Sequence, residues 1–385
     1  MIYLDNAATT SPKPERVIAA VEAAVREYTA NPGRSGHAMA SDCAQAVFSA
    51  RKTAGAFFGV LNPEQVIFTP GCTYSVNMAL KGMLKPGDHV IMSDLEHNAV
   101  VRPLHALAQT GVEVGRAKVI EGDHAATVAN FRGKIKSNTR MIFCTQASNV
   151  FGLRLPVEEL GRLCAEYGLL FGIDAAQSAG IIPIDMARLR ADAICVPGHK
   201  GLYGVMGSGA LLLKEGLDIH PIIEGGTGSA SAARDMPEYL PDRLEGGTAN
   251  IIGILAMAAG INFIESTGIA AIAHHEFSLI QKAYEGLSTC KGVKLYTSFP
   301  RPESHVPLIS FNIDGVPSEE TGAALGRDGI AVRAGFHCAF DAHLAFGTGQ
   351  SGTVRVCPSV FTAEEDISAL LDSVERLIKK TKKYE

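Results

Sequence analysis

Short runs of apolar and β-branched residues recur along the first half of the chain and alternate with segments of helical periodicity. The runs are QVIFTP (65–70), HVIMSD (89–94), TRMIFCT (139–145), LLFGID (169–174), DAICVP (192–197) and GALLLK (209–214). Between them, segments 76–84 and 156–168 have the pattern of helices, and the second opens with Pro156 and ends at Gly168. Strands that alternate with helices predict an α/β fold with a mostly parallel sheet covered on both faces.

The pattern changes near residue 262. Segments 307–313 and 329–335 are predicted to be strands, and segment 362–383 is predicted to be a terminal amphipathic helix with basic residues in its last turns. We therefore expect a large domain and a second, smaller α+β domain. The expected divisions are an N-terminal segment that joins the small domain (1–20), the large domain (21–261) and the small domain (262–385).

Composition narrows the class of protein. The chain has 385 residues, is 46% hydrophobic and carries a formal net charge of −5, which argues against a nucleic-acid or anionic-membrane surface. The longest near-apolar stretch, 251–264, is shorter than a bilayer span and predicts a buried helix. The start MIYLDNAATT lacks the features of a signal peptide, and the eight cysteines form no CxxC pair. We expect a cytoplasmic protein with no metal site, no nucleic-acid partner and no membrane contact.

Polar residues follow several of the predicted strands. Asp174 closes one strand, Lys200 follows the next, and His97 and Asn149 lie in the turns after two others. In open α/β sheets, ligands bind outside the carboxyl ends of the strands, so these side chains should lie close together.

The turn PGCTYSVN adds an anion site. Gly71, Cys72 and Thr73 link a strand to a helix, and the free N–H groups there suit a phosphate. A phosphate site, a carboxylate and a lysine at strand ends match the needs of pyridoxal 5′-phosphate (PLP). Taken singly, each residue has an ordinary alternative, since Thr73 could be a helix N-cap and Lys200 a solvated surface lysine. A nicotinamide-binding protein is disfavoured, because no G-x-G-x-x-G links a first strand to a helix.

A family resemblance rests on seven motifs. They are YLDNAATT (3–10), EHNA (96–99), SNVFG (148–152), IDAAQSAG (173–180), GHKGLYG (198–204), EGGTAN (245–250) and VRAGFHCA (332–339). In this order they resemble the PLP-dependent cysteine desulfurases and selenocysteine lyases of the class V aminotransferase group. The resemblance implies the fold of type I PLP-dependent transferases, with a seven-stranded type of sheet in the large domain.

The resemblance also implies roles for residues at the cofactor. Lys200 would be the Schiff-base lysine, Asp174 the partner of the pyridinium nitrogen, His97 the ring stacked on the cofactor and Gln177 the contact to its O3′. Asn149 could also bind O3′ or a carboxylate nearby.

The remaining implied roles concern the phosphate. Thr73 and His199 would bind it, and Thr248 would reach the phosphate of a neighbouring subunit, which implies a homodimer. The family usually has a serine or threonine where Pro197 stands, so one phosphate hydrogen bond is expected to be missing.

Desulfuration requires a thiolate that attacks the substrate sulfur. Cys338, in RAGFHCAF, is the candidate, and Cys357 is a weaker one because its run VRVCPSV has the pattern of a strand. Arg355 matches the family's carboxylate-binding arginine, with Asn149 as its helper. Arg34, in NPGRSGH, resembles a residue near the substrate entrance.

The leading hypothesis is a cysteine desulfurase, which converts L-cysteine to L-alanine and an enzyme-bound persulfide. The short stretch between Cys338 and Arg355 resembles the second desulfurase group, whose members act on cysteine and selenocysteine and often need a separate sulfur-acceptor protein. The alternatives are a selenocysteine lyase, another aminotransferase-like PLP enzyme in which Cys338 is incidental, and a non-catalytic scaffold. The presence of Lys200, Asp174 and Cys338 argues against the scaffold.

Overall fold

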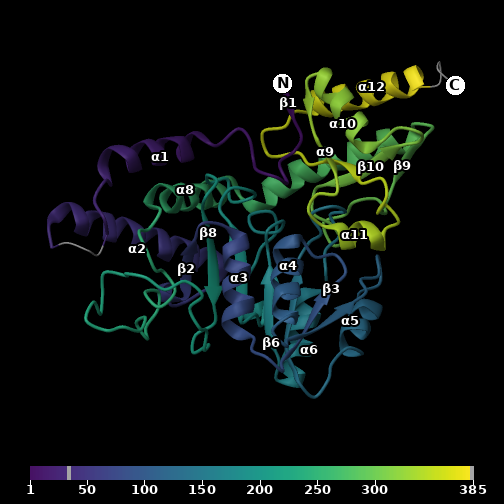
Figure 1. Cartoon of the computed structure of the whole chain (residues 1–385). Coiled ribbons are helices and arrows are strands. Elements are labelled where there is room, and N and C mark those ends of the chain that lie inside the picture. The colour runs from purple at the N-terminus through teal and green to yellow at the C-terminus, as the bar shows by residue number, and fades with distance from the viewer. Residues whose placement is uncertain (33–35, 382–385) are drawn as a thin grey trace.

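A computed structural model describes residues 1–32 and 36–381 (Figure 1). Its centre is a seven-stranded sheet, whose strands in spatial order are β2 (Val66–Thr69), β8 (Gly209–Leu213), β7 (Ala193–Pro197), β6 (Leu170–Asp174), β5 (Thr139–Thr145), β3 (His89–Ser93) and β4 (Glu113–Ala117). The pairs from β7 to β4 are parallel, and β8 is antiparallel to both of its neighbours. The predicted α/β class and mostly parallel sheet are confirmed.

With one exception, the helices of this part of the chain cover both faces of the sheet. They are α1 (Glu15–Glu27), α2 (Ala38–Phe58), the short 3-10 helix η1 (Pro63–Gln65), α3 (Cys72–Met83), α4 (Asn98–Ala108), α5 (His124–Arg132), α6 (Val157–Tyr167), α7 (Met186–Leu189) and α8 (Ile251–Thr267). The exception is α1, which packs against α8. Alternate residues of β3 face opposite sides: Val90 and Met92 pack with α3 and α4, whereas Ile91 packs with α2 and α6. This alternation explains why the three central residues of β3 are all apolar, since both faces of the strand are buried.

The C-terminal part builds a second core. Its elements are α9 (Ile269–Thr289), β9 (Val293–Leu295), β10 (Ile309–Ile313), α10 (Ser318–Arg327), β11 (Ile330–Ala331), β12 (Arg333–Gly335), α11 (Phe340–Ala345), β13 (Thr353–Val356) and α12 (Glu364–Thr381). Strands β12, β13, β10 and β9 form an antiparallel sheet in that order. Segment 329–335 is therefore two strands rather than the single strand predicted, because β11 pairs with a different partner, β1 (Ile2–Tyr3).

The N-terminal segment touches both parts of the molecule. Strand β1 lies beside the C-terminal elements in Figure 1, and Leu4 belongs to their core. Helix α1 instead packs against α8. The predicted boundary at residue 262 lies within α8, which continues to Thr267 before the chain bends by 83° into α9. The division into two domains stays a prediction.

Within residues 1–32 and 36–381, no single helix is long and apolar enough to cross a bilayer. Helices α8 and α9 reach the required length only when taken together across their bend.

Candidate active site

A cavity of about 350 Å³ lies at the carboxyl ends of the parallel strands. It collects nine of the residues selected from the sequence, namely Cys72, Thr73, His97, Asn149, Asp174, Gln177, His199, Lys200 and Arg355. They come from the ends of β3, β5, β6, β7 and β13 and from the start of α3. Parallel strands bring these positions to one edge of the sheet although they are distant in the sequence.

Asp174 lies at the bottom of this cavity with only 2% of its surface exposed. Its Oδ1 accepts hydrogen bonds from the backbone N–H of Ala176 at 2.9 Å and from the Cys72 thiol at 3.3 Å. Burial raises the pKa of Asp174, and Lys200 opposes that rise. A buried carboxylate of this kind favours a cationic partner, such as a protonated ring nitrogen.

Lys200 follows β7 in a tightly packed loop. A Cβ on Gly201 would approach the Ala179 carbonyl oxygen to 2.4 Å, so only glycine fits beside the lysine. The Lys200 carbonyl accepts a hydrogen bond from the Tyr203 N–H at 2.8 Å. Burial lowers the pKa of Lys200, and the nearby Arg355 lowers it further. Both effects favour a neutral, nucleophilic amine.

His97 caps the N-terminus of α4. Its Nδ1 accepts a hydrogen bond from the Ala99 N–H at 2.9 Å, so a neutral ring carries its proton on Nε2. Burial lowers the pKa of His97 to about 4, and Lys200 contributes in the same direction. The imidazole is therefore neutral at physiological pH and suits stacking on an aromatic ring.

The N-terminus of α3 opens into the same cavity and could hold an anion. The N-cap residue of α3 is Gly71, which has no side chain to form a capping hydrogen bond. Thr73 is therefore not the N-cap but lies in the first turn of the helix. The helix dipole and the free N–H groups of this turn favour a bound anion. His199 lines the same cavity, and its buried Nδ1 has no hydrogen-bond partner among the described residues. Pro197, at the end of β7, also lines the cavity and offers no N–H.

Gln177 and Asn149 complete the walls of the cavity. Gln177 Nε2 donates to the Ala7 carbonyl at 3.0 Å, which ties the N-terminal segment to the site. Asn149 Nδ2 donates to the His337 carbonyl at 2.7 Å, while its buried Oδ1 has no partner among the described residues.

Arg355 is the buried cation of the cavity, with 1% of its surface exposed. Its Nη1 donates to the Asn149 carbonyl at 2.8 Å, and its Nη2 pairs with Asp5 at 2.8 Å. Arg355 and Asn149 are thus in contact through the backbone of Asn149, and the role of Asn149 as a helper in carboxylate binding stays a prediction. A second arginine, Arg333, lines the same cavity.

Cys338 lies on an exposed turn between β12 and α11. Both His337 and Cys338 have positive φ angles, 49° and 59°. The turn is anchored to the site because the Asn98 N–H donates to the Cys338 carbonyl at 2.7 Å, and Arg333 Nη2 lies 3.4 Å from Cys338 Sγ. Cys357 differs, since burial raises the pKa of its thiol to about 12.

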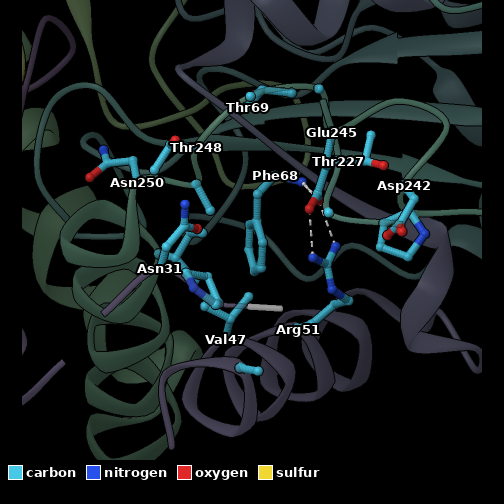
Figure 2. Close-up of a pocket in the computed structure, with 18 of the residues that line it drawn as sticks. Asn31, Val47, Arg51, Phe68, Thr69, Thr227, Asp242, Glu245, Thr248 and Asn250 are labelled. Carbon is cyan, nitrogen blue, oxygen red and sulfur yellow. Dashed lines mark hydrogen bonds and ion pairs between the residues drawn. The ribbon is translucent and has the colours of Figure 1, made fainter. Parts of the chain in front are cut away.

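Thr248 does not line this cavity. It lies in a second cavity of about 600 Å³, beside Phe68 and the ion pair of Arg51 with Glu245 (Figure 2). The two cavities share Pro70 in their walls. Arg34 lies outside the described residues.

Three residues of the site were missed by the sequence analysis. Arg333 contacts Cys338, Asp5 pairs with Arg355, and the buried Glu96 accepts hydrogen bonds from the N–H of Thr145 at 2.9 and 3.0 Å. All three lie within the quoted motifs. A charged residue inside such a motif was the sequence feature that could have identified them as candidates.

Comparisons of the sequence and of the structure with known proteins point to one protein family. The sequence profile described as aminotransferase class-V matches residues 2–370. Probable cysteine desulfurases from Methanothermobacter thermautotrophicus and Pyrococcus abyssi are 30% and 33% identical, over 98% of this chain and 94% of each relative. The apo structure of a cysteine desulfurase from Thermococcus onnurineus superposes with a TM-score of 0.90 at 30% identity, over 98% of this chain and 95% of that one. The cysteine desulfurase CsdA from Escherichia coli gives a TM-score of 0.86 at 27% identity, over 98% and 94%.

Proposed function

The chain belongs to the class-V aminotransferase family, and we propose that it is a cysteine desulfurase that transfers sulfur from L-cysteine to Cys338. The family depends on PLP, which is the cofactor of this chain. Bound PLP supplies an electron sink that weakens the bonds to the α-carbon of an amino acid. The observation that carries the proposal is the exposed Cys338, held by Arg333 and Asn98 next to the cavity that contains Lys200.

The residues of the cavity fit this cofactor. Asp174 is a buried carboxylate for the ring nitrogen, and the start of α3 provides N–H groups for the phosphate. The unpartnered Nδ1 of His199 and Oδ1 of Asn149 are polar atoms that a bound ligand would satisfy. Lys200 would hold the cofactor covalently, and the neutral His97 would stack on its ring. One phosphate hydrogen bond that a serine or threonine would supply is missing at Pro197.

Arg355 and Asn149 would bind the substrate. A guanidinium binds a carboxylate with charge-assisted hydrogen bonds, and burial strengthens them. Arg355 is buried in the wall of the same cavity as Lys200. The carboxylate of a small amino acid can therefore be held at Arg355 while its amino group lies near Lys200 and the cofactor. The Lys200 amine, once the substrate amine had replaced it on the cofactor, would accept a proton from the α-carbon, and its lowered pKa favours that role.

Cys338 would accept the sulfur. The Cβ–S bond of the substrate breaks and an S–S bond to Cys338 Sγ forms, which leaves alanine and a persulfide. One of the two thiol protons ends on Cβ of alanine, and the other stays on the terminal sulfur. Arg333 Nη2, 3.4 Å from Sγ, would orient the sulfur that makes this attack.

Two partners complete the proposal. We infer a homodimer, in which Thr248 contributes to the neighbouring phosphate site. We also infer a sulfur-acceptor protein, because Phe336, Phe340 and Leu344 expose 38%, 46% and 57% of their surface around Cys338. Exposed apolar side chains next to a reactive group are typical of a docking surface.

An assay with two substrates tests the proposal against its alternatives. The wild-type protein should release alanine and sulfide from L-cysteine in the presence of a thiol reductant. Cys338→Ala should lose about 10³-fold or more of this rate, since it removes the covalent catalyst. It should retain activity on L-selenocysteine, because selenium leaves carbon more easily than sulfur does.

Cys290→Ala is the matched control, because Cys290 lies near the end of α9 and does not line the cavity. A wild-type protein that releases selenium but not sulfur would be a selenocysteine lyase. Transamination without sulfur release would indicate an aminotransferase, and Cys338 would then be incidental.

A further inference from the structure

Asp5 is fixed beside the strand that carries Arg355. Asp5 and Cys357 form a parallel β-bridge, and the N–H of Cys357 donates to the Leu4 carbonyl at 2.8 Å. On the other side, Asn6 Nδ2 donates to the Cys357 carbonyl at 3.0 Å. The backbone of Asp5 is therefore held at the end of β13, two residues beyond Arg355.

The Asp5 carboxylate determines which hydrogen-bond donors of Arg355 remain free. Asp5 Oδ1 accepts a hydrogen bond from Nη2 at 2.8 Å, and the Asn149 carbonyl accepts one from Nη1 at 2.8 Å. The third nitrogen, Nε, is buried and has no partner among the described residues. Arg355 lines the cavity, and each Nη carries a second N–H beyond the one used by Asp5 or Asn149, so the guanidinium keeps donors for a ligand.

We propose that Asp5 is a positioning residue for the substrate carboxylate: it fixes the orientation of the Arg355 guanidinium in the wall of the cavity, so that the N–H groups not used by Asp5 and Asn149 are left for that carboxylate. The inference rests on the proposed function, in which Arg355 binds the substrate. Asp5 acts only through Arg355.

The energetics favour this role. A guanidinium that is 1% exposed requires a compensating charge, and Asp5 provides one while keeping 21% of its own side chain exposed. An arginine side chain also has several rotatable bonds, so two fixed hydrogen bonds define its orientation. Without Asp5, the guanidinium would lose both the charge and one of the bonds that orient it.

Ligand binding to the PLP-loaded protein tests the proposal. L-Alanine carries the α-carboxylate and 2-aminopropane lacks it, and the binding of either amine is followed by the absorbance of the bound cofactor. In Asp5→Ala, the Kd of L-alanine should rise about tenfold or more, the loss expected for a charge-assisted hydrogen bond. The Kd of 2-aminopropane should stay within about twofold of the wild-type value.

Steady-state kinetics give a second readout. The KM for L-cysteine should rise about tenfold in Asp5→Ala while kcat falls less than about threefold, because ground-state binding of the carboxylate is lost. Asp5→Asn keeps an acceptor at Oδ1 and should recover part of the affinity, which also covers the case that Asp5→Ala folds poorly. Asp328→Asn, at a surface ion pair with Arg376, is the control and should behave like the wild type.

Unchanged L-alanine binding in both Asp5 variants would overturn the proposal. So would an equal weakening of both amines, because that result would indicate general damage to the site. These outcomes differ from a failure of the proposed function, in which the wild-type protein itself would release no sulfur from L-cysteine.

Discussion

At the scale of single residues, two amines at the end of β7 lie in different surroundings. Lys13 Nζ is held by the Thr10 hydroxyl at 2.9 Å and the His199 carbonyl at 3.1 Å. Burial lowers the pKa of Lys13 to about 8 and also lowers that of Lys200. Only Lys200 lines the cavity, so Lys200 is the amine that is free to bind the cofactor.

Borohydride reduction of the PLP-loaded protein, followed by peptide mass mapping, checks this assignment. The pyridoxyl group is expected on Lys200, and Lys200→Ala should lose both the label and about 10³-fold or more of the activity. Lys13→Arg should keep the label on Lys200, because its charge and its donors are retained. A label on Lys13 would contradict the assignment.

At the scale of elements, α11 and the turn before it hold Cys338 through buried histidines. His343 is fully buried, its Nδ1 lies 2.7 Å from the Thr348 hydroxyl, and its ring stacks on that of His337 with centroids 5.7 Å apart. Burial lowers the pKa of His343 from 6.5 to about 4. Between these values the unfolded chain binds a proton that the folded chain excludes, so the stability from this group is lost as the pH falls through that range.

Urea unfolding of the apoprotein above and below this pH range measures the effect. The wild type and His343→Gln should both lose stability in acid, because both contain other buried histidines. His343→Gln should lose less than the wild type between the two pH values, since it removes one group that takes up a proton on unfolding. Equal losses in the two proteins would show that His343 is not buried in the neutral form.

The elements also show what the sequence could predict. Apolar runs revealed most of the central sheet, and the strand ends then placed Asp174 and Lys200 at one edge, because parallel strands align their carboxyl ends. Strand β4, EVGRA, was not predicted, since as an edge strand it is only partly buried and has no apolar run. The pairing of Asp5 with Arg355 joins residues 350 positions apart, and no local pattern encodes such a contact.

At the scale of the whole molecule, the position of Thr248 supports a shared active site. Thr248 lines the second cavity, separated from the cofactor cavity by the shared wall at Pro70. Phe48, in the same second cavity, exposes 45% of its surface. An exposed apolar surface next to a residue predicted to act on a neighbour suits an interface between two copies of this chain.

Light scattering and cofactor titration test this arrangement. The active protein should have twice the mass of one chain, and Thr248→Val should weaken PLP binding about threefold to tenfold by removing one hydrogen bond to the phosphate. Thr289→Val, at the exposed end of α9, should bind PLP normally. A fully active monomer would refute the shared site.

The transfer of the substrate sulfur to Cys338 can be observed by mass spectrometry of the trapped persulfide. The PLP-loaded protein is mixed with L-cysteine, alkylated at once and digested without reductant. We expect one additional sulfur atom on the peptide that contains Cys338. None is expected on the peptide with the buried Cys357, because burial raises the pKa of that thiol to about 12. An additional sulfur on Cys357, or sulfur release at the wild-type rate by Cys338→Ala, would contradict this transfer.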